Sequence, residues 1–227
     1  MSCADAPPAV THTLPDAGPD PYDASPYVPQ RGGLPAHRRA AAVCRGCPLF
    51  EHATQTVFGK GDPSARIVVV GEQPGDQEDR QGEPFVGPAG RLLRKALREA
   101  GIDVDAAYLT NVVKHFKFSQ EGPGKRRIHK APSLREMSAC RPWLIAELHL
   151  VRPDVVVALG ATAGKALVGG SFRVTRDRGA LIPMADEDGG RHVVATIHPS
   201  AVLRANDREA AYAGLLADLK VAAKALE

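Results

Sequence analysis

Four short apolar runs, rich in Val and Ile and separated by helical patterns, constrain the fold of this chain more than any other feature. They lie at residues 65–72, 106–113, 154–160 and 191–199. Short runs without polar alternation are typical of strands that are buried on both faces, and such strands are usually parallel. Strands that alternate with helices predict an α/β fold, here a three-layer α/β/α sandwich around a central, mainly parallel four-stranded sheet.

The helices between these runs carry their own start and stop signals. Pro88 and Gly101 bracket an amphipathic stretch, as expected for a first-turn proline and a glycine beyond the helix end. Ser133 and Glu136 form a capping box, which predicts a helix that runs to about Val151. The other predicted helices lie at residues 36–44, at residues 161–169, and from a cap at Asn206 to the C-terminus.

The first 36 residues differ from the rest in composition. They hold eight of the 19 prolines, with four Asp and a single Arg, and they show no apolar periodicity. Such a segment cannot bury enough apolar surface to fold by itself. We therefore expect a disordered or extended proline-rich arm at residues 1–36 and one domain with a sizeable core at residues 37–227.

The composition of the 227-residue chain indicates a globular protein, with 44% hydrophobic and 24% charged residues. No apolar run approaches the ~18 residues of a membrane-spanning helix. The N-terminus lacks the basic and apolar segments of a signal peptide. These features predict a cytoplasmic protein with no membrane partner. Since no oligomerisation pattern is present, we expect a monomer.

Polar clusters follow three of the predicted strands, and they contain Glu72, Asn111 and His198. Because the carboxyl ends of parallel strands share one edge of a sheet, we expect the three clusters to converge on one cleft. The first cluster adds a second carboxylate, Asp79, which we expect in the substrate site. It also adds Phe85, a loop aromatic that either stacks on a planar ligand or fills the core.

A cationic stripe runs from Val112 to Arg135, where seven Lys or Arg accompany one acid. Such a stripe suits phosphate groups, although a solvated basic loop has the same composition. Lys125, Arg126 and Arg127 are the candidate phosphate ligands. His129 lies among them, in a segment bounded by glycine and proline. Phosphate binding by the cations does not explain why the segment also holds an imidazole.

The cysteines point to a second site. Cys44 and Cys47 form a C-x-x-C pair, and Cys140 and Cys3 complete the set of four. In a cytoplasmic protein this spacing indicates a metal, a cluster or a redox dithiol rather than a structural disulfide.

Several motifs, in matching order along the chain, resemble those of family 4 uracil-DNA glycosylases, the iron–sulfur branch of that superfamily. They are GEQPGDQEDRQGEPFVGPAG at residues 71–90, LTNVVK at 109–114, EMSACRPWL at 136–144 and HPSAVLR at 198–204. The resemblance spans about residues 40 to 222. It implies the release of free uracil from a nucleotide flipped out of uracil-containing DNA, with single-stranded DNA accepted.

The resemblance also implies roles for the cleft residues. Phe85 would stack on the uracil ring, and Asn111 would pair with the edge that carries N3–H and O4. His198 would donate to uracil O2 and stabilise the negative charge on the leaving base. Glu72 would lie below the sugar, where positive charge develops at C1′.

Two departures from family 4 resemble the UdgX subgroup. GEQPG stands in place of GEAPG, and His115 is followed by an insertion that contains KRRIH. That subgroup bonds covalently to DNA at the uracil site and does not turn over, which implies His129 as the nucleophile at C1′. Glu72 would take or orient its ring proton, and Gln73 would tether the loop or the base. The neighbouring cations would favour the neutral imidazole.

For the cysteines, the resemblance implies a 4Fe–4S cluster held by Cys44, Cys47 and Cys140. Its fourth ligand is either His115, at the position of the family's cysteine, or Cys3 in the arm. Three cysteines and one histidine also suit zinc, so the ligand set alone does not choose the metal.

The segment after His198 offers further DNA contacts. On a predicted loop, Leu203 either wedges into the space left by the flipped nucleotide or belongs to the core, and Arg204 binds a phosphate. Two alternatives to a self-trapping enzyme stay open. One is a conventional glycosylase with multiple turnovers, whose basic loop only holds phosphates. The other is a non-catalytic cluster protein that binds nucleic acid through its basic stripe.

Overall fold

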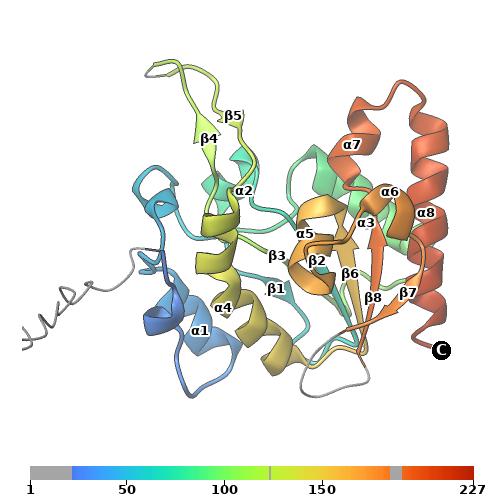
Figure 1. Ribbon diagram of the computed structural model, residues 1–227, viewed down its shortest axis with the longest axis horizontal. Helices are drawn as coiled ribbons and strands as arrows, with labels where there is room; N and C mark the ends of the chain where they lie inside the picture. The colour runs from blue at the N-terminus through green and yellow to red at the C-terminus, as the bar shows by residue number, and fades with distance from the viewer. Residues whose placement is uncertain (1–21, 123, 185–190) are drawn as a thin grey trace, which may run out of the picture.

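The computed structural model describes residues 22–122, 124–184 and 191–227, and its centre is a six-stranded sheet. The strand order is β1-β3-β2-β6-β8-β7 (Figure 1). The four inner strands are parallel and coincide with the predicted runs: β3 (Ala107–Asn111), β2 (Ile67–Gly71), β6 (Val155–Leu159) and β8 (His192–Thr196). The predicted α/β sandwich with a mainly parallel sheet is therefore confirmed.

The sheet is wider than predicted, because a short antiparallel strand closes each edge. These strands are β1 (Lys60–Gly61) and β7 (Leu181–Pro183). Neither has the length or the β-branched composition that identifies a strand in a sequence. A proline in β7 is tolerated because that strand lies at the edge.

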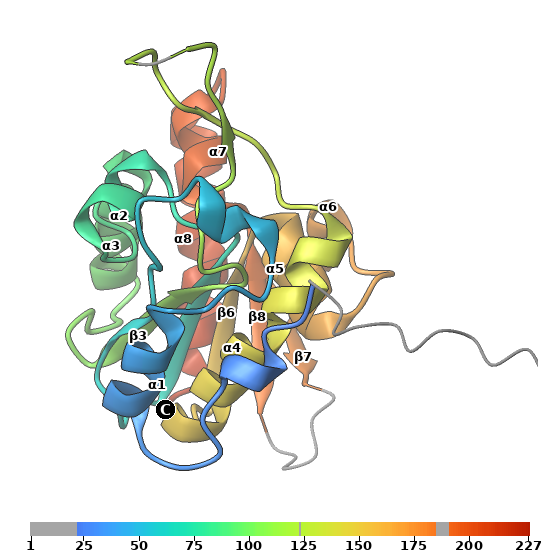
Figure 2. The same cartoon turned by 90° about the vertical axis from the view of Figure 1, so that its left-hand side faces the viewer.

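Helices cover both faces of the sheet. One face is covered by α1 (Leu34–Ala41), α4 (Leu134–Val151) and α5 (Gly160–Val168), and the other by α3 (Pro88–Glu99), α7 (Pro199–Arg204) and α8 (Arg208–Lys224). Figure 2 shows the sheet between α3 and α5. The shorter elements are η1 (Ser25–Tyr27), η2 (Pro48–Glu51), α2 (Asp76–Gln81) and α6 (Val174–Asp177).

Alternate residues of each inner strand supply the two halves of the core. In β2, Val68 and Val70 pack with the cluster under α4 and α5, whereas Ile67 and Val69 pack with the cluster under α3 and α8. Every residue of β2 is buried. Burial on both faces explains why the strand sequence is continuously apolar.

A separate hairpin of β4 (Phe118–Ser119) and β5 (Ile128–His129) projects beyond the edge of the sheet (Figure 1). Phe118 pairs with His129 and Ser119 with Ile128. The inserted basic segment therefore forms a β-hairpin above the carboxyl ends of the parallel strands.

Two details at the chain ends differ from the sequence predictions. The last helix is capped by Asp207, whose side chain accepts from Ala210 N, and not by Asn206. Of the predicted arm, residues 22–36 are described and contact the domain: Ala24 is buried and its N–H donates to Ala139 O at 3.0 Å. A side chain at Gly46 would collide with Ala24, so this glycine lets the segment dock. Within the described ranges, none of the helices is long and apolar enough to cross a lipid bilayer.

Candidate active site

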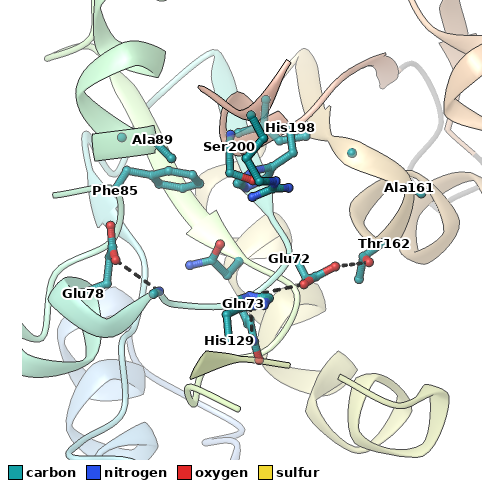
Figure 3. Close-up of a pocket in the computed structure, with 16 residues that line it drawn as sticks. Glu72, Gln73, Glu78, Phe85, Ala89, His129, Ala161, Thr162, His198 and Ser200 are labelled. Atoms are coloured by element: carbon teal, nitrogen blue, oxygen red, sulfur yellow. Dashed lines mark hydrogen bonds and ion pairs between the residues drawn. The ribbon is translucent and has the colours of Figure 1, made fainter. Parts of the chain in front are cut away.

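A pocket of about 600 Å³ opens at the carboxyl ends of the parallel strands, where the three polar clusters meet. Figure 3 shows its walls. It is lined by Glu72, Gln73, Gly75, Glu78, Phe85, Ala89, Gly90, Asn111, His129, Leu159, Gly160, Ala161, Thr162, His198, Ser200 and Arg204. The predicted convergence of the clusters is confirmed.

Glu72 follows β2 and is held from the neighbouring strand end. Its Oε2 accepts a hydrogen bond from Thr162 Oγ1 in α5, and its Oε1 lies 3.5 Å from His129 Nε2. Thr162 was not predicted as a site residue. Its only sequence signal is its place just after the third apolar run, at the same edge of the sheet.

Gln73 ties the hairpin to the sheet. Its Oε1 accepts from Lys117 N at 3.1 Å, which turns the amide nitrogen towards Lys130 O at 2.9 Å and towards His129 Nε2 at 2.8 Å. The same nitrogen of Gln73 also lies 3.2 Å from Lys117 O, so three acceptor atoms surround its two N–H groups. The Gln73 amide thus fixes where the imidazole of His129 lies, with Nε2 on the side of Glu72.

Phe85 and Asn111 form the base-sized part of the pocket. Both side chains are buried, and a Cβ added at Gly71 would lie 2.4 Å from Asn111 Oδ1 and 2.8 Å from Phe85 Cζ. Phe85 has φ 57°, a left-handed conformation that is rare for an aromatic residue and typical of functional sites. The side chain belongs to the core cluster and lines the pocket, so the two interpretations of Phe85 are compatible.

His198 caps the N-terminus of α7. Its Nδ1 accepts from Ser200 N at 3.1 Å, with Ser200 Oγ at 2.8 Å. Desolvation lowers the pKa of His198 to about 4, and Arg204 and His129 add to the effect. In a neutral ring whose Nδ1 is an acceptor, Nε2 carries the proton, so His198 offers one N–H donor.

Asp79 and Arg127 differ from their predicted roles. Asp79 is fully buried in α2 outside the pocket, where it accepts from Thr54 N at 3.0 Å and from Arg127 Nη1 at 2.6 Å. Arg127 also donates to Asp76 Oδ1 at 2.5 Å, and only 8% of its side chain is exposed. Asp79 and Arg127 thus hold the hairpin against α2. Lys125 and Arg126 stay exposed.

Leu203 and Arg204 lie in helix α7 and not on a loop. Leu203 is half-buried and lines a groove with residues of α3 and α8, among them Leu92 and Tyr212. Arg204 is exposed at the rim of the active-site pocket. Of the two, Arg204 is therefore the residue that is placed to meet a phosphate near the pocket.

The cysteines gather at a second place. Cys44, Cys47 and Cys140 are free and buried, and together with His115 they surround a narrow space that has no room for a water molecule. In the described part of the chain, no group of three or more His, Cys, Asp and Glu side chains is arranged so that it could hold a metal ion. Cys3 lies outside the described residues.

The donors around this space suit an iron–sulfur cluster in their chemistry, and not in their present arrangement. Trp143 Nε1 donates to Cys44 Sγ and Lys114 N to Cys140 Sγ, each at 3.3 Å, and such bonds stabilise thiolate sulfur. Burial raises the pKa of Cys140 to about 12, so a bound cation is needed to deprotonate this thiol at neutral pH.

His115 can contribute a fourth donor to the same space. Thr56 Oγ1 donates to Ala41 O at 2.8 Å, so it accepts from His115 Nε2 at 2.9 Å. Nδ1 of His115 is then the unprotonated nitrogen. This partner on the far nitrogen is the arrangement by which proteins orient a ligating histidine.

Comparison with known proteins agrees with this site. The profile of the uracil DNA glycosylase superfamily matches residues 58–220. A type-4 uracil-DNA glycosylase of Thermotoga maritima is 43% identical over 167 residues, which cover 73% of this chain and 81% of the relative. A type-4 enzyme of Sulfurisphaera tokodaii is 35% identical, covering 70% and 71% of the two chains. A type-5 uracil-DNA glycosylase of Pyrobaculum aerophilum is 32% identical, covering 67% and 71%. The chain belongs to the uracil-DNA glycosylase superfamily.

Proposed function

We propose that this protein excises uracil from DNA by breaking the N-glycosidic bond of a flipped-out nucleotide. The observation that carries the proposal is a single pocket in which Phe85, Asn111, Glu72 and His198 line the walls. The type-4 relatives, which are named uracil-DNA glycosylases, support the same substrate and the same product, free uracil. A cytoplasmic location and a monomeric state remain predictions from the sequence.

The base would be recognised before the bond breaks. Phe85 offers an apolar face to the uracil ring, and the Asn111 amide supplies both a donor and an acceptor to the edge with O4 and N3–H. Cytosine presents the opposite pattern at that edge, so a fixed amide orientation discriminates against it. We assign Asn111 to specificity for this reason.

Bond cleavage moves an electron pair from C1′–N1 onto the base. The Nε2–H of His198 is available to hydrogen-bond the O2 on which negative charge grows, which is the kind of preorganised donor that stabilises a transition state. Glu72 is held by Thr162, and its carboxylate would stabilise the positive charge that develops on the sugar.

The cluster has no step in this chemistry. Cys44, Cys47 and Cys140, with His115 as the fourth donor, would hold four irons and four sulfides, which would supply a structural cross-link. These residues come from the segment after α1, from α4 and from the segment after β3. The cross-link would therefore join the N-terminal segment to the helix that packs under the sheet.

A second candidate function is self-trapping through His129. The observation that favours it is the position of His129 Nε2, 3.5 Å from Glu72 Oε1 at the wall of the pocket. In the neutral ring that carries its proton on Nδ1, Nε2 would form a bond to C1′ as uracil leaves with the electron pair of the glycosidic bond. The Nδ1 proton of the resulting imidazolium would then pass to the uracil anion or to water. The type-4 relatives favour the conventional alternative, in which water attacks C1′.

One experiment tests both candidates. A uracil-containing single-stranded oligonucleotide is incubated with wild-type, His129→Ser and His198→Ala protein, and free uracil and a denaturing gel are read together. Excision predicts uracil from wild type and little from His198→Ala; no uracil from cluster-loaded wild type would overturn it. Self-trapping predicts one uracil per protein and a shifted band that His129→Ser abolishes. Many uracils per protein without a shifted band would establish conventional turnover.

A further inference from the structure

A second groove of about 790 Å³ adjoins the active-site pocket. It lies between the N-terminal ends of α2 and α3 and the β4–β5 hairpin, and it shares Gly75, Glu78, Ala89 and His129 with the pocket. Its own lining consists of Asp76, Gln77, Gly87, Pro88, Phe116, Arg126, Arg127 and Ile128. Two spaces that share His129 are placed to hold consecutive parts of one ligand.

Ile128 is the unusual residue of this groove. It is 48% exposed although it is a large aliphatic residue, and it directly precedes His129 in β5. The other exposed large apolar residues of the described chain, Val43, Leu134 and Leu181, line neither space. Exposing a large aliphatic side chain to water costs free energy, and a bound ligand that covers the side chain removes this cost. An exposed apolar residue beside a reaction site therefore indicates a place where a ligand binds.

The charges around the groove favour a ligand with an anionic group, and the exposed Ile128 favours a ligand that also has an apolar part. Arg126 lines the groove and is exposed, and among the described residues no ion pair neutralises it. The acids of the opposite wall are already occupied: Asp76 pairs with Arg80 and Arg127, and the Glu78 carboxylate accepts from Gly75 N at 3.1 Å and Gly87 N at 2.8 Å. The hydrogen-bonding capacity of both acids is thus engaged on their own side of the groove, and Arg126 is the cation of the groove that has no acidic partner among the described residues.

We infer that this groove holds the nucleotide next to the excised uracil, with its base against Ile128 and Pro88 and its phosphate on Arg126. The inference rests on the proposed function, since it requires DNA in the adjoining pocket. Apolar contacts with the face of a base are similar for all four bases. Binding in the groove would therefore require a neighbouring base without selecting which base it is.

The test compares a protein change with a DNA change. Single-turnover uracil release is measured for wild type and Ile128→Ala on oligonucleotides in which the 5′ or the 3′ neighbour of dU is a normal nucleotide or a tetrahydrofuran abasic sugar. Leu181→Ala is the matched control, because Leu181 is 44% exposed and lies on β7 at the other edge of the sheet. Affinity for the same oligonucleotides is measured in parallel by fluorescence anisotropy at one salt concentration.

We expect Ile128→Ala to lower release and affinity about fivefold when both neighbours carry bases, as for a partly buried aliphatic contact. The loss should vanish when the base on one particular side is removed, and Leu181→Ala should behave as wild type. An equal loss on every oligonucleotide, or none at all, overturns the inference. Absence of uracil release by wild type overturns the proposed function instead, and the affinity comparison then still decides whether the groove holds a neighbouring base.

Discussion

The two walls of the active-site pocket are built in different ways. The wall that carries Asn111 and His198 belongs to the sheet, and His198 is oriented by a backbone N–H of its own turn. The opposite wall is the hairpin, where the His129 side chain is 49% exposed and is oriented by the side chain of Gln73. The ring of His198 is therefore positioned by a main-chain atom, whereas the ring of His129 is positioned by another side chain.

The supports under the walls differ in the same way. Beneath the sheet wall, Lys114 Nζ donates to Glu147 Oε2 at 2.5 Å, and to Thr110 Oγ1 and Asn111 O at 2.7 Å each. At most 1% of either charged side chain is exposed. The hairpin is held by the ion pairs of Arg127 with Asp76 and with the buried Asp79 of α2, and it carries the exposed cations Lys125 and Arg126. The sheet wall should therefore control stability, and the hairpin wall should control the encounter with DNA.

Removing the charge beneath the sheet wall should have the largest effect. Lys114→Met leaves Glu147 buried without its cation and should lower the free energy of unfolding by about 3–5 kcal/mol in urea titrations. The double variant Lys114→Met/Glu147→Gln should recover part of that loss. A loss near the ~0.5 kcal/mol of an ordinary surface substitution would contradict this account of the network.

Removing the donor of the sheet wall should cost activity rather than stability. His198→Ala should reduce single-turnover uracil release by about 10²–10³, the effect of losing one donor to a developing anion. Thermal unfolding recorded on the same sample checks that the fold persists. Ser200→Ala, which only loosens the orientation of the ring, should lose less; a larger loss there would move the assignment from His198 to Ser200.

A fall in pH should lower the stability of the protein through His198 in the sheet wall. The pKa of His198 is lowered from 6.5 to about 4, so the unfolded chain binds a proton that the folded chain resists. Stability from this residue is complete above pH 6.5 and is lost as the pH falls towards 4. We expect a loss of about 2 kcal/mol between pH 7 and pH 5 from this one group. Urea titrations of His198→Asn should show that much less dependence on pH, and identical slopes would contradict the prediction.

The smallest effects on DNA binding should come from the hairpin arginines. Arg126→Ala should weaken binding to every DNA sequence a few-fold and reduce the slope of log K against log salt by about 1. Arg127→Ala should leave that slope nearer to wild type, because Asp76 and Asp79 already neutralise its charge. It should instead lower the stability of the protein, because the fully buried Asp79 loses its cation, and it should expose the hairpin to limited proteolysis. Equal salt slopes for the two variants would show that Arg127 also reaches DNA.

Much of this protein was determined by local sequence. Apolar runs identified the four parallel strands, and a capping box identified the start of α4 at Ser133. The convergence of Glu72, Asn111 and His198 followed from one rule, that parallel strands present their carboxyl ends at one edge. These features depend on periodicity and chain direction, which a sequence records directly.

The remaining features were decided by the tertiary structure. Thr162 reaches Glu72 across 90 positions of sequence, and Arg127 reaches Asp79 across 48. A side chain's partner depends on where distant backbone segments cross, and composition does not encode that. The basic stripe therefore predicted an anion for all of its cations, yet only the fold showed that Arg127 pairs with the protein's own carboxylates while Arg126 stays exposed.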